Sequence, residues 1–296
     1  MDDQTPKVQV APPVSLLLAA LTLPRKTTVV DVGANPINEA PYAALLKMGG
    51  CHVVGFEPQA DAFAALQKTI TPNETYHPFA VGNGGPCELK IYRSSGMTSI
   101  FDPYKPGLRA IGQKGWAKVV ETVAFQTVAL DNIPDLAPFD LLKIDIQGGE
   151  TLVFEGAETV LKSAVAVIVE LRYLRLYLGE PMLGGVDNEL RRQGFYLHKF
   201  MFNKSKGLPN SQSDRLRRLK VSDQLVDGDG VYLRNIAEPG LMTNAQLMHL
   251  AILAASVFES HTVVLYCLDE LIRRNAAPAD LPARYVDLLP MALRTK

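Results

Sequence analysis

The first residues that could do chemistry follow an apolar, β-branched run at 27–32, which predicts a buried strand. Asp31, Gly33, Ala34 and Asn35 stand at its carboxyl end. Ligands of open α/β sheets bind at this edge, where a glycine lets the backbone approach and free N–H groups can hold an anion. The Asp31 carboxylate could face an ammonium group there, although Asp followed closely by glycine is as often only a turn.

A second acidic residue ends the next predicted strand. Glu57 comes 26 residues after Asp31 and is followed by Pro58. A carboxylate at this strand tip can accept the hydroxyl groups of an adenosine ribose, and the plainer alternative is an acid at the start of a helix. The dinucleotide fingerprint G-x-G-x-x-G is absent, because Gly33 stands alone and Pro36 has no N–H to donate. The pattern therefore favours an adenosine that bears an amino acid over one that bears a pyrophosphate.

A third predicted strand contains two charged residues within the segment 141–150, LLKIDIQGGE. Lys143 and Asp145 are two positions apart and so share one face of the strand. Buried charges are costly unless they are paired, so both residues need a reason to be there. That reason is either a functional site at the carboxyl end of the strand or a structural ion pair, with Asp145 already in water.

In order along the chain, DVGAN, GFEP, LLKIDIQGGE and VIVEL resemble the FkbM-type family of class I S-adenosylmethionine-dependent methyltransferases. The similarity covers about residues 29–200, and the K-I-D-x-x-G-x-E segment at 143–150 is its most specific part. It implies an α/β fold with a Rossmann-like sheet of seven strands, mostly parallel, with an antiparallel last strand. It also implies S-adenosyl-L-methionine as cofactor and usually O-methylation of a hydroxyl group on a sugar, glycan or natural product.

The resemblance also implies roles for individual residues. Asp145 would lie near the transferring methyl group and belong to the cofactor site. The other implied cofactor-binding positions are Asp31, Gly33, Ala34 and Asn35 near the methionine end, Glu57 and Pro58 near the ribose, and Phe79, Ala80 and Val81 beside the adenine.

Two departures from the family pattern are visible. Pro36-Ile37-Asn38 and then Pro41 follow the DVGAN motif, where the family commonly has an apolar residue and then a glycine. We therefore expect the next helix to start later, after a longer loop. Gln147 and Gly149 replace the more usual Glu and Ala, which removes one charge near the expected active site.

Methyl transfer to an alcohol needs oxygen, carbon and sulfur in line and a group that takes the hydroxyl proton. Asp145 is the nearest carboxylate at the strand end, and His198 belongs to the residue type that titrates closest to pH 7. We predict both as catalytic, although a single His in such a strand is more often structural. No His/Asp cluster has ligand spacing, so no metal is expected. The predicted substrate-binding residues are Gln147, Glu170, Arg172 and Tyr173.

Alternating strand and helix patterns predict a parallel sheet with crossover helices. We divide the chain into an arm with a short helix at 1–26, a methyltransferase domain at 27–236 and a C-terminal helical extension at 237–296. A β insertion is expected at 82–131 and a basic loop at 203–224. Further strands are predicted at 52–57, 75–81, 139–145, 165–170, 195–200 and 230–234, and helices at 41–48, 151–162, 186–193 and 244–275.

The bulk properties exclude several classes of protein. The 296 residues are 47% hydrophobic with a net charge of −1, so the chain can bury a full core and has no basic footprint for nucleic acid. Three widely spaced cysteines without C-x-x-C argue against a disulfide framework or a zinc site. The start of the chain lacks a basic signal segment, and the longest apolar stretches, 14–23 and 245–258, are too short to span a bilayer. We expect a cytoplasmic protein without a transmembrane segment.

The last helical region, 244–275, is apolar on more than one face, so we predict a homo-oligomer that associates through it. The basic segment 204–220 is either a solvated loop or, as a hypothesis, a mobile lid over an acidic or sugar-bearing substrate.

Two alternatives to an S-adenosylmethionine-dependent O-methyltransferase stay open. A nucleotide-dependent oxidoreductase on a related sheet is opposed by the missing second and third glycines of its fingerprint. A catalytically silent assembly protein that keeps the fold is favoured by Pro36. The sequence does not identify the hydroxyl acceptor.

Overall fold

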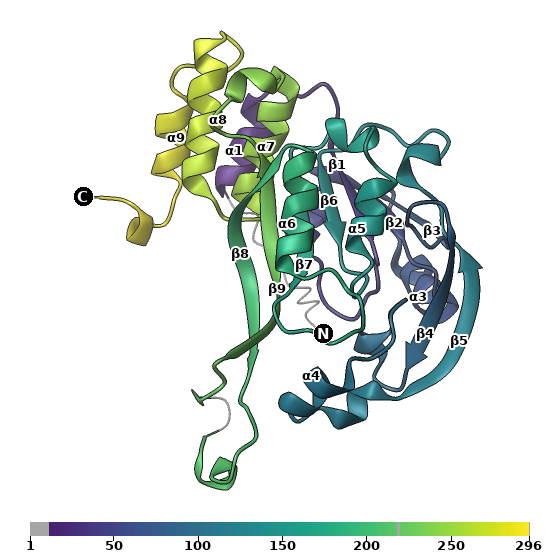
Figure 1. Ribbon diagram of the computed structural model, residues 1–296. Coiled ribbons are helices and arrows are strands. Elements are labelled where there is room, and N and C mark those ends of the chain that lie inside the picture. The colour runs from purple at the N-terminus through teal and green to yellow at the C-terminus, as the bar shows by residue number, and fades with distance from the viewer. Residues whose placement is uncertain (1–11, 218–219, 296) are drawn as a thin grey trace, which may run out of the picture.

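The computed structural model describes residues 12–217 and 220–295. Its centre is a seven-stranded sheet in the order β3-β2-β1-β6-β7-β9-β8 (Figure 1). The pairs from β3 to β7 are parallel, whereas β9 runs antiparallel to both of its neighbours. The predicted Rossmann-like sheet with an antiparallel last strand is confirmed. The strands are β1 (Thr27–Val32), β2 (Cys51–Phe56), β3 (Glu74–His77), β6 (Leu141–Ile144), β7 (Ala166–Arg172), β8 (Phe195–Lys206) and β9 (Gln224–Arg234).

Helices cover both faces of this sheet because alternate side chains of the central strands point to opposite sides. Val29 and Leu141 belong to a core shared with α1, α2, α7, α8 and α9, while Val30 and Leu142 belong to a core shared with α5 and α6. The helices are α1 (Pro12–Ala20), α2 (Ala43–Lys47), α3 (Ala60–Thr69), α5 (Glu150–Glu155), α6 (Leu183–Arg192), α7 (Asn244–Ser256), α8 (His261–Arg273) and α9 (Leu281–Asp287).

The β insertion is a separate two-stranded antiparallel sheet of β4 (Pro86–Tyr92) and β5 (Val119–Gln126). With α4 (Lys105–Ala110) it builds a third, smaller core around Tyr92, Leu108 and Tyr177. A single bridge between Val81 and Val128 connects it to the segment that follows β3. The insertion therefore lies where it can cover the carboxyl ends of the first strands.

Helix α7 is buried nearly all round, including every residue from 247 to 254. It packs against α1 and α8, and its first turn is closed by a capping box between Thr243 and Gln246. The apolar excess that predicted a homo-oligomer is thus covered within one chain, and it gives no reason to expect a second copy.

Several boundaries differ from the predicted ones. The third strand ends at His77 rather than at 81, and the helix expected over 151–162 ends at Glu155. Gly156, which follows that helix, packs closely against the main chain at Gly82, since a Cβ at 156 would lie 2.2 Å from the Gly82 carbonyl oxygen. The last two strands are longer than expected, so part of the predicted basic loop at 203–224 is the end of β8 and the start of β9.

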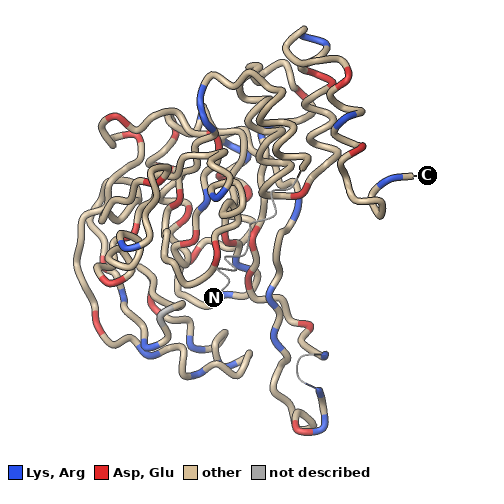
Figure 2. The backbone as a smooth tube through the Cα atoms, turned by 180° about the vertical axis from the view of Figure 1, so that it is seen from behind, with Lys and Arg blue, Asp and Glu red and all other residues tan. Residues whose placement is uncertain are grey.

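The β8–β9 hairpin projects beyond the sheet and bears several of the basic side chains (Figure 2). Arg218 of its connection and residues 1–11 of the predicted arm lie outside the described residues. Within 12–217 and 220–295, none of the helices has the length and apolar character needed to traverse a bilayer.

Candidate active site

The ends of β1 and β6 approach so closely that only glycine fits between them. Gly33 has a φ of +80°, and a Cβ at this position would lie 2.2 Å from the main-chain oxygen of Asp145. The Asp145 N–H donates to the Val32 carbonyl oxygen over 3.1 Å. The glycine of the DVGAN motif thus brings two predicted site segments together.

Asp31 is buried and already has a cationic partner. Its Oδ1 lies 3.2 Å from Lys143 Nζ, and the Tyr42 hydroxyl donates to its Oδ2 over 2.5 Å. Burial alone lowers the pKa of Lys143, but the carboxylates of Asp31 and Asp145 outweigh it and the net pKa is raised. Of the two explanations open for Lys143, the structure therefore shows the structural ion pair. The ammonium group that Asp31 faces is that of Lys143.

The loop after β1 is longer than in the family pattern, because α2 begins only at Ala43. The N–H groups of Gly33 and Ala34 both donate to the Phe56 carbonyl oxygen, over 3.0 and 3.2 Å. These two groups are therefore not available to hold an anion. Asn35 is half-buried beside them.

Glu57 lies at the carboxyl end of β2 and is 2% exposed. Its Oε1 accepts the Gln59 N–H over 2.8 Å, and no residue of the described chain donates a hydrogen bond to Oε2. Burial raises the pKa of Glu57, and the Gln59 N–H opposes that shift. One oxygen of a buried carboxylate is thus left to accept hydrogen bonds from a ligand.

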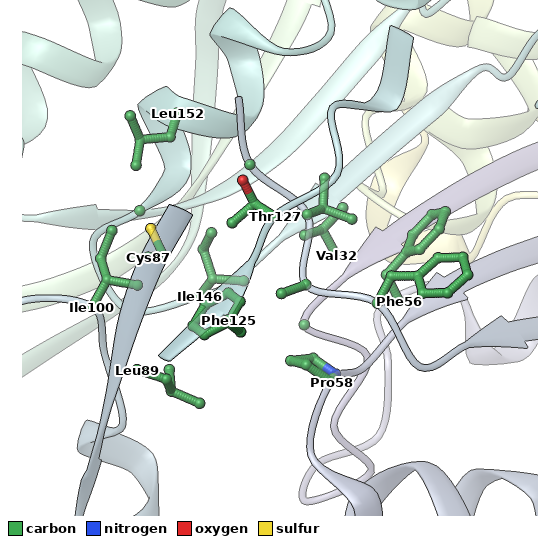
Figure 3. Close-up of a pocket in the computed structure, with 16 residues that line it drawn as sticks. Val32, Phe56, Pro58, Cys87, Leu89, Ile100, Phe125, Thr127, Ile146 and Leu152 are labelled. Carbon is green, nitrogen blue, oxygen red and sulfur yellow. The ribbon is translucent and has the colours of Figure 1, made fainter. Parts of the chain in front are cut away.

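An apolar pocket is lined by Phe56 and Pro58, the two neighbours of Glu57 in the sequence (Figure 3). Figure 3 shows Val32, Phe56 and Pro58 on one side, and side chains of the insertion, such as Phe125, on the other. Such a lining suits a flat, weakly polar ring. The pocket is lined by Val32, Gly33, Phe56, Pro58, Phe79, Ala80, Val81, Gly82, Cys87, Leu89, Ile100, Phe125, Thr127, Ile146, Gly149 and Leu152.

The pocket includes predicted residues and others that were missed. Gly33, Pro58, Phe79, Ala80 and Val81 were all predicted near the cofactor. Most of the missed residues come from the insertion, namely Cys87, Leu89, Ile100, Phe125 and Thr127, and others, such as Ile146 and Leu152, follow β6. The only signal in the sequence was the alternation of apolar and polar residues at 86–92, which puts two of them on one face of β4.

Gln147 connects the charged residues at the ends of β6 and β7. Its amide nitrogen donates to Asp145 Oδ1 over 3.0 Å and to Glu170 Oε2 over 2.8 Å. Its amide oxygen accepts from Arg172 over 3.2 Å and from the Tyr177 hydroxyl over 3.3 Å. A neutral amide satisfies all four groups, whereas a glutamate here would add a carboxylate beside two others. The departure from the family pattern at 147 fits its surroundings.

Arg172 was predicted to bind substrate, but its guanidinium is fully engaged by the protein. It lies 2.8 Å from Glu170 Oε2, 3.3 Å from Glu180 Oε2 and 3.0 Å from Asp227 Oδ2, and its side chain is 4% exposed. The guanidinium of Arg172 therefore holds these carboxylates in place, and Arg172 also lines a second cavity. Burial raises the pKa of Glu170 well above its usual range, Asp145 raises it further, and Arg172 opposes the shift.

Tyr173 lines a second cavity of about 420 Å³ on the α6 side of the sheet. Its hydroxyl donates to Asn203 Oδ1 over 2.7 Å, and its ring meets Phe200 edge-on. Gln147 and Glu170 do not line this cavity, so the structure divides the predicted substrate-binding set between two places. The lining residues are Arg172, Tyr173, Met182, Leu183, Gly184, Phe200, Asn203 and Leu225.

His198 is not brought to the site. Its Nε2 lies 2.9 Å from Ser260 Oγ, in the connection between α7 and α8. It falls at a register shift of β8 between Leu197 and Lys199, and this irregularity directs its ring toward the C-terminal helices. Burial, assisted by Lys199, lowers its pKa. The structure therefore gives no support to the prediction of His198 as a catalytic base.

One further carboxylate at this edge was missed by sequence reasoning. Asp229 lies on β9 directly opposite Glu170. The D-G-D-G sequence at 227–230 was its only local signal. Among the residues that the structure describes, no group of three His, Cys, Asp or Glu side chains could hold a metal ion.

A sheet in this order, with one antiparallel strand and a pocket across the carboxyl ends of β1 and β2, is the arrangement of class I methyltransferases. Residues 31–197, more than half of the chain, match the family model described as Methyltransferase FkbM domain. The chain therefore belongs to the FkbM methyltransferase family.

Solved structures show weaker similarity. A methyltransferase FkbM from Methylobacillus flagellatus KT has 12% identity and a TM-score of 0.38, with 70% of this chain and 43% of that chain covered. A precorrin-6y C5,15-methyltransferase from Geobacter metallireducens GS-15 has 12% identity and a TM-score of 0.37, with coverage of 75% and 87%. Magnesium protoporphyrin IX methyltransferase from Synechocystis PCC 6803, crystallised with bound SAM, has 12% identity and a TM-score of 0.36, with coverage of 79% and 87%. These similarities are too low to support an argument about chemistry.

The match thus spans less than half of the Methylobacillus flagellatus chain. No curated protein matches the sequence significantly.

Proposed function

We propose that this protein is an S-adenosylmethionine-dependent O-methyltransferase that acts on a hydroxyl group of a sugar, glycan or natural product. The observation that supports it most directly is Glu57, a buried carboxylate with one oxygen free, whose two neighbours in the sequence, Phe56 and Pro58, line an apolar pocket. A ribose needs a hydrogen-bond acceptor and an adenine needs a flat apolar slot, and both lie side by side at the carboxyl ends of β1 and β2. Family membership supplies the reaction class.

In this proposal the adenine occupies the pocket lined by Phe79, Ala80, Val81 and Phe125, and the ribose hydroxyl groups donate to Glu57. The methionine part passes Gly33, which lines the pocket, toward Asn35 and the Asp31–Lys143 pair. When bound, the cofactor supplies an electrophilic methyl group on a positively charged sulfur.

The residues at the ends of β6 and β7 would orient the acceptor. Asp145 is exposed at the end of β6, and Gln147 holds it together with Glu170. Carboxylate oxygens at this edge can accept a hydrogen bond from the hydroxyl group and hold its oxygen in line with the methyl carbon. Arg172 keeps Glu170 and the neighbouring Asp227 in place. The Tyr173 cavity would bind a more distant part of the acceptor.

One observation favours the silent-scaffold alternative. Because the N–H groups of Gly33 and Ala34 donate to Phe56, these two groups cannot hold the carboxylate of a cofactor. If the protein is a catalytically silent assembly protein, it binds neither S-adenosylmethionine nor S-adenosylhomocysteine.

Calorimetric titration with S-adenosylmethionine, S-adenosylhomocysteine and NADH separates the three classes. We expect the first two to bind, with S-adenosylhomocysteine the tighter, and NADH to give no signal. Preferential binding of NADH would indicate an oxidoreductase, and the absence of any binding would indicate a scaffold. Mass spectrometry of hydroxylated metabolites and glycans after incubation with S-adenosylmethionine then identifies the acceptor by a gain of about 14 Da per methyl group.

A further inference from the structure

Asp229 stands in a row of carboxylates across the carboxyl end of the sheet. It pairs in register with Glu170 on β7, and the pairing of Ile144 with Val169 places Asp145 next to Glu170 on the other side. Residues that oppose each other in an antiparallel pair have Cβ atoms about 4.5–5.5 Å apart. Asp145, Glu170 and Asp229 therefore lie in one row on the same face of β6, β7 and β9.

The carboxylates around Asp229 are held by other side chains. Asp145 accepts from Gln147, and Glu170 accepts from Gln147 and Arg172. Asp227, two positions before Asp229, is bound by Arg172 and by Lys204 Nζ at 3.2 Å. The side chain of Asp229 makes no hydrogen bond or ion pair with any residue in 12–217 or 220–295, and the residue is half-buried. Its carboxylate is free to accept a proton.

The backbone at Asp229 is fixed by its two glycine neighbours. A Cβ at Gly228 would lie 2.4 Å from the Phe202 carbonyl oxygen, and one at Gly230 would lie 2.5 Å from Leu171 Cδ1. Strand β9 is also hydrogen-bonded on both edges, to β7 and to β8. The side chain thus projects from a rigid strand, as a group that must meet a reacting atom requires.

We propose that Asp229 is the catalytic residue that removes the proton from the acceptor hydroxyl during methyl transfer, an inference that rests on the proposed function. The hydroxyl oxygen uses a lone pair to form the bond to the methyl carbon. The carbon–sulfur bonding pair stays on sulfur, which becomes a neutral thioether, and the hydroxyl proton passes to the Asp229 carboxylate. Loss of that proton to water restores the residue.

The electrostatic surroundings suit this role. Burial raises the pKa of Asp229 to about 6, with Asp145 and Asp227 adding to the shift and Lys143 and Lys204 opposing it. These charges come from β6, from β9 itself and from β8, and Glu170 faces the residue from β7. A carboxylate with this pKa is about nine-tenths ionised at pH 7 and is a stronger base than an ordinary Asp.

The test uses the intact protein labelled with ¹³C at the aspartate carboxyl carbon. The resonance that disappears in Asp229→Asn identifies the residue, with Asp229→Ser as a second variant should the first not fold. Asp223→Asn, an exposed position in the hairpin connection, is the matched control and should leave this resonance unchanged. We expect it to titrate with a midpoint near pH 6.

Saturating S-adenosylmethionine should lower that midpoint by about one pH unit relative to saturating S-adenosylhomocysteine, because only the former brings a positive sulfur and its methyl group close to the carboxylate. Equal midpoints with both nucleosides bound would overturn the role of Asp229 and leave the proposed function standing. Failure of both nucleosides to bind would overturn the proposed function, and the inference with it.

With an acceptor in hand, Asp229→Asn should lower kcat about 10²- to 10⁴-fold and remove the acidic limb of the pH–rate profile, while the affinity for S-adenosylhomocysteine stays within about twofold of the unmodified protein. An unchanged rate and pH profile would contradict the assignment.

Discussion

Replacement of Glu57 by glutamine changes the charge at the ribose position and almost nothing else. The side chain keeps its size, and its remaining oxygen can still accept the Gln59 N–H, which now lies at 2.8 Å. What is lost is the charge-assisted hydrogen bond that a ribose hydroxyl group donates to Oε2, worth about 1.5–3 kcal/mol. At about 1.4 kcal/mol per tenfold change, the Kd for S-adenosylhomocysteine should rise about 10- to 150-fold, measured by calorimetry at pH 7.5.

The same substitution, Glu57→Gln, should not lower the stability of the folded protein, although it weakens ligand binding. The pKa of Glu57 is raised in the folded protein, mainly by burial, so folding disfavours its ionised form. The resulting cost is present at neutral pH and disappears as the pH falls below the value for the unfolded chain. Glutamine removes this cost, so the Tm of Glu57→Gln at pH 7.5 should equal or exceed that of the unmodified protein. The two should converge near pH 4.

Affinity should also depend on pH in a defined direction. Protonation of Glu57 as the pH falls through its raised pKa removes the ionised acceptor, so S-adenosylhomocysteine should bind more weakly at pH 5 than at pH 7.5. Glu57→Gln should show no such dependence over this interval. Glu155→Gln, which removes the same charge at an exposed position on α5, is the control and should behave like the unmodified protein. Equal affinity of Glu57→Gln and the control would refute the ribose assignment.

Two more outcomes follow from the ion pair and the cysteines. Lys143→Met should lower the free energy of unfolding by about 3–5 kcal/mol, because it leaves buried Asp31 without its cation. The double variant Asp31→Asn/Lys143→Met should recover much of this loss in urea titrations. If the losses of the two single variants simply added in the double variant, the pairing would be contradicted. Cys87 lines the pocket, whereas burial raises the pKa of Cys51 and of Cys267 to about 12. N-ethylmaleimide should therefore label Cys87 first, at a rate that S-adenosylhomocysteine reduces, as followed by mass spectrometry; an unprotected Cys87 would place the nucleoside elsewhere.

The cofactor half of the site could be predicted because it depends on local rules. A β-branched run that ends in Asp31 and Gly33, and another that ends in Glu57, mark carboxyl ends of parallel strands, and such ends meet at one edge of a sheet. Phe79, Ala80 and Val81 follow the next strand and reach the same pocket. The family resemblance then supplied the order of these segments, which the structure confirms as neighbouring strands.

The acceptor half depended on contacts that no local pattern shows. Asp229 reaches Glu170 because β9 inserts between β7 and β8 in the antiparallel sense, a pairing of residues far apart in the chain. Phe125 reaches the pocket because the insertion folds back over the sheet. His198 was misplaced because a register shift in β8 turns its ring toward Ser260.

The same limit applies to the homo-oligomer, which stays a prediction. An apolar stretch on several faces of a helix shows only that the helix is buried, and α7 is buried by α1, α8 and the sheet of its own chain. Which surface covers such a helix is decided by the fold as a whole and not by the composition of the segment.

A crystal structure of the complex with S-adenosylhomocysteine tests the central claim most directly. The account predicts ribose hydroxyl groups within hydrogen-bond distance of Glu57 Oε2 and the adenine between Pro58 and Phe125, with the sulfur pointing toward Asp145. Electron density for the nucleoside at any other place on the molecule would contradict it.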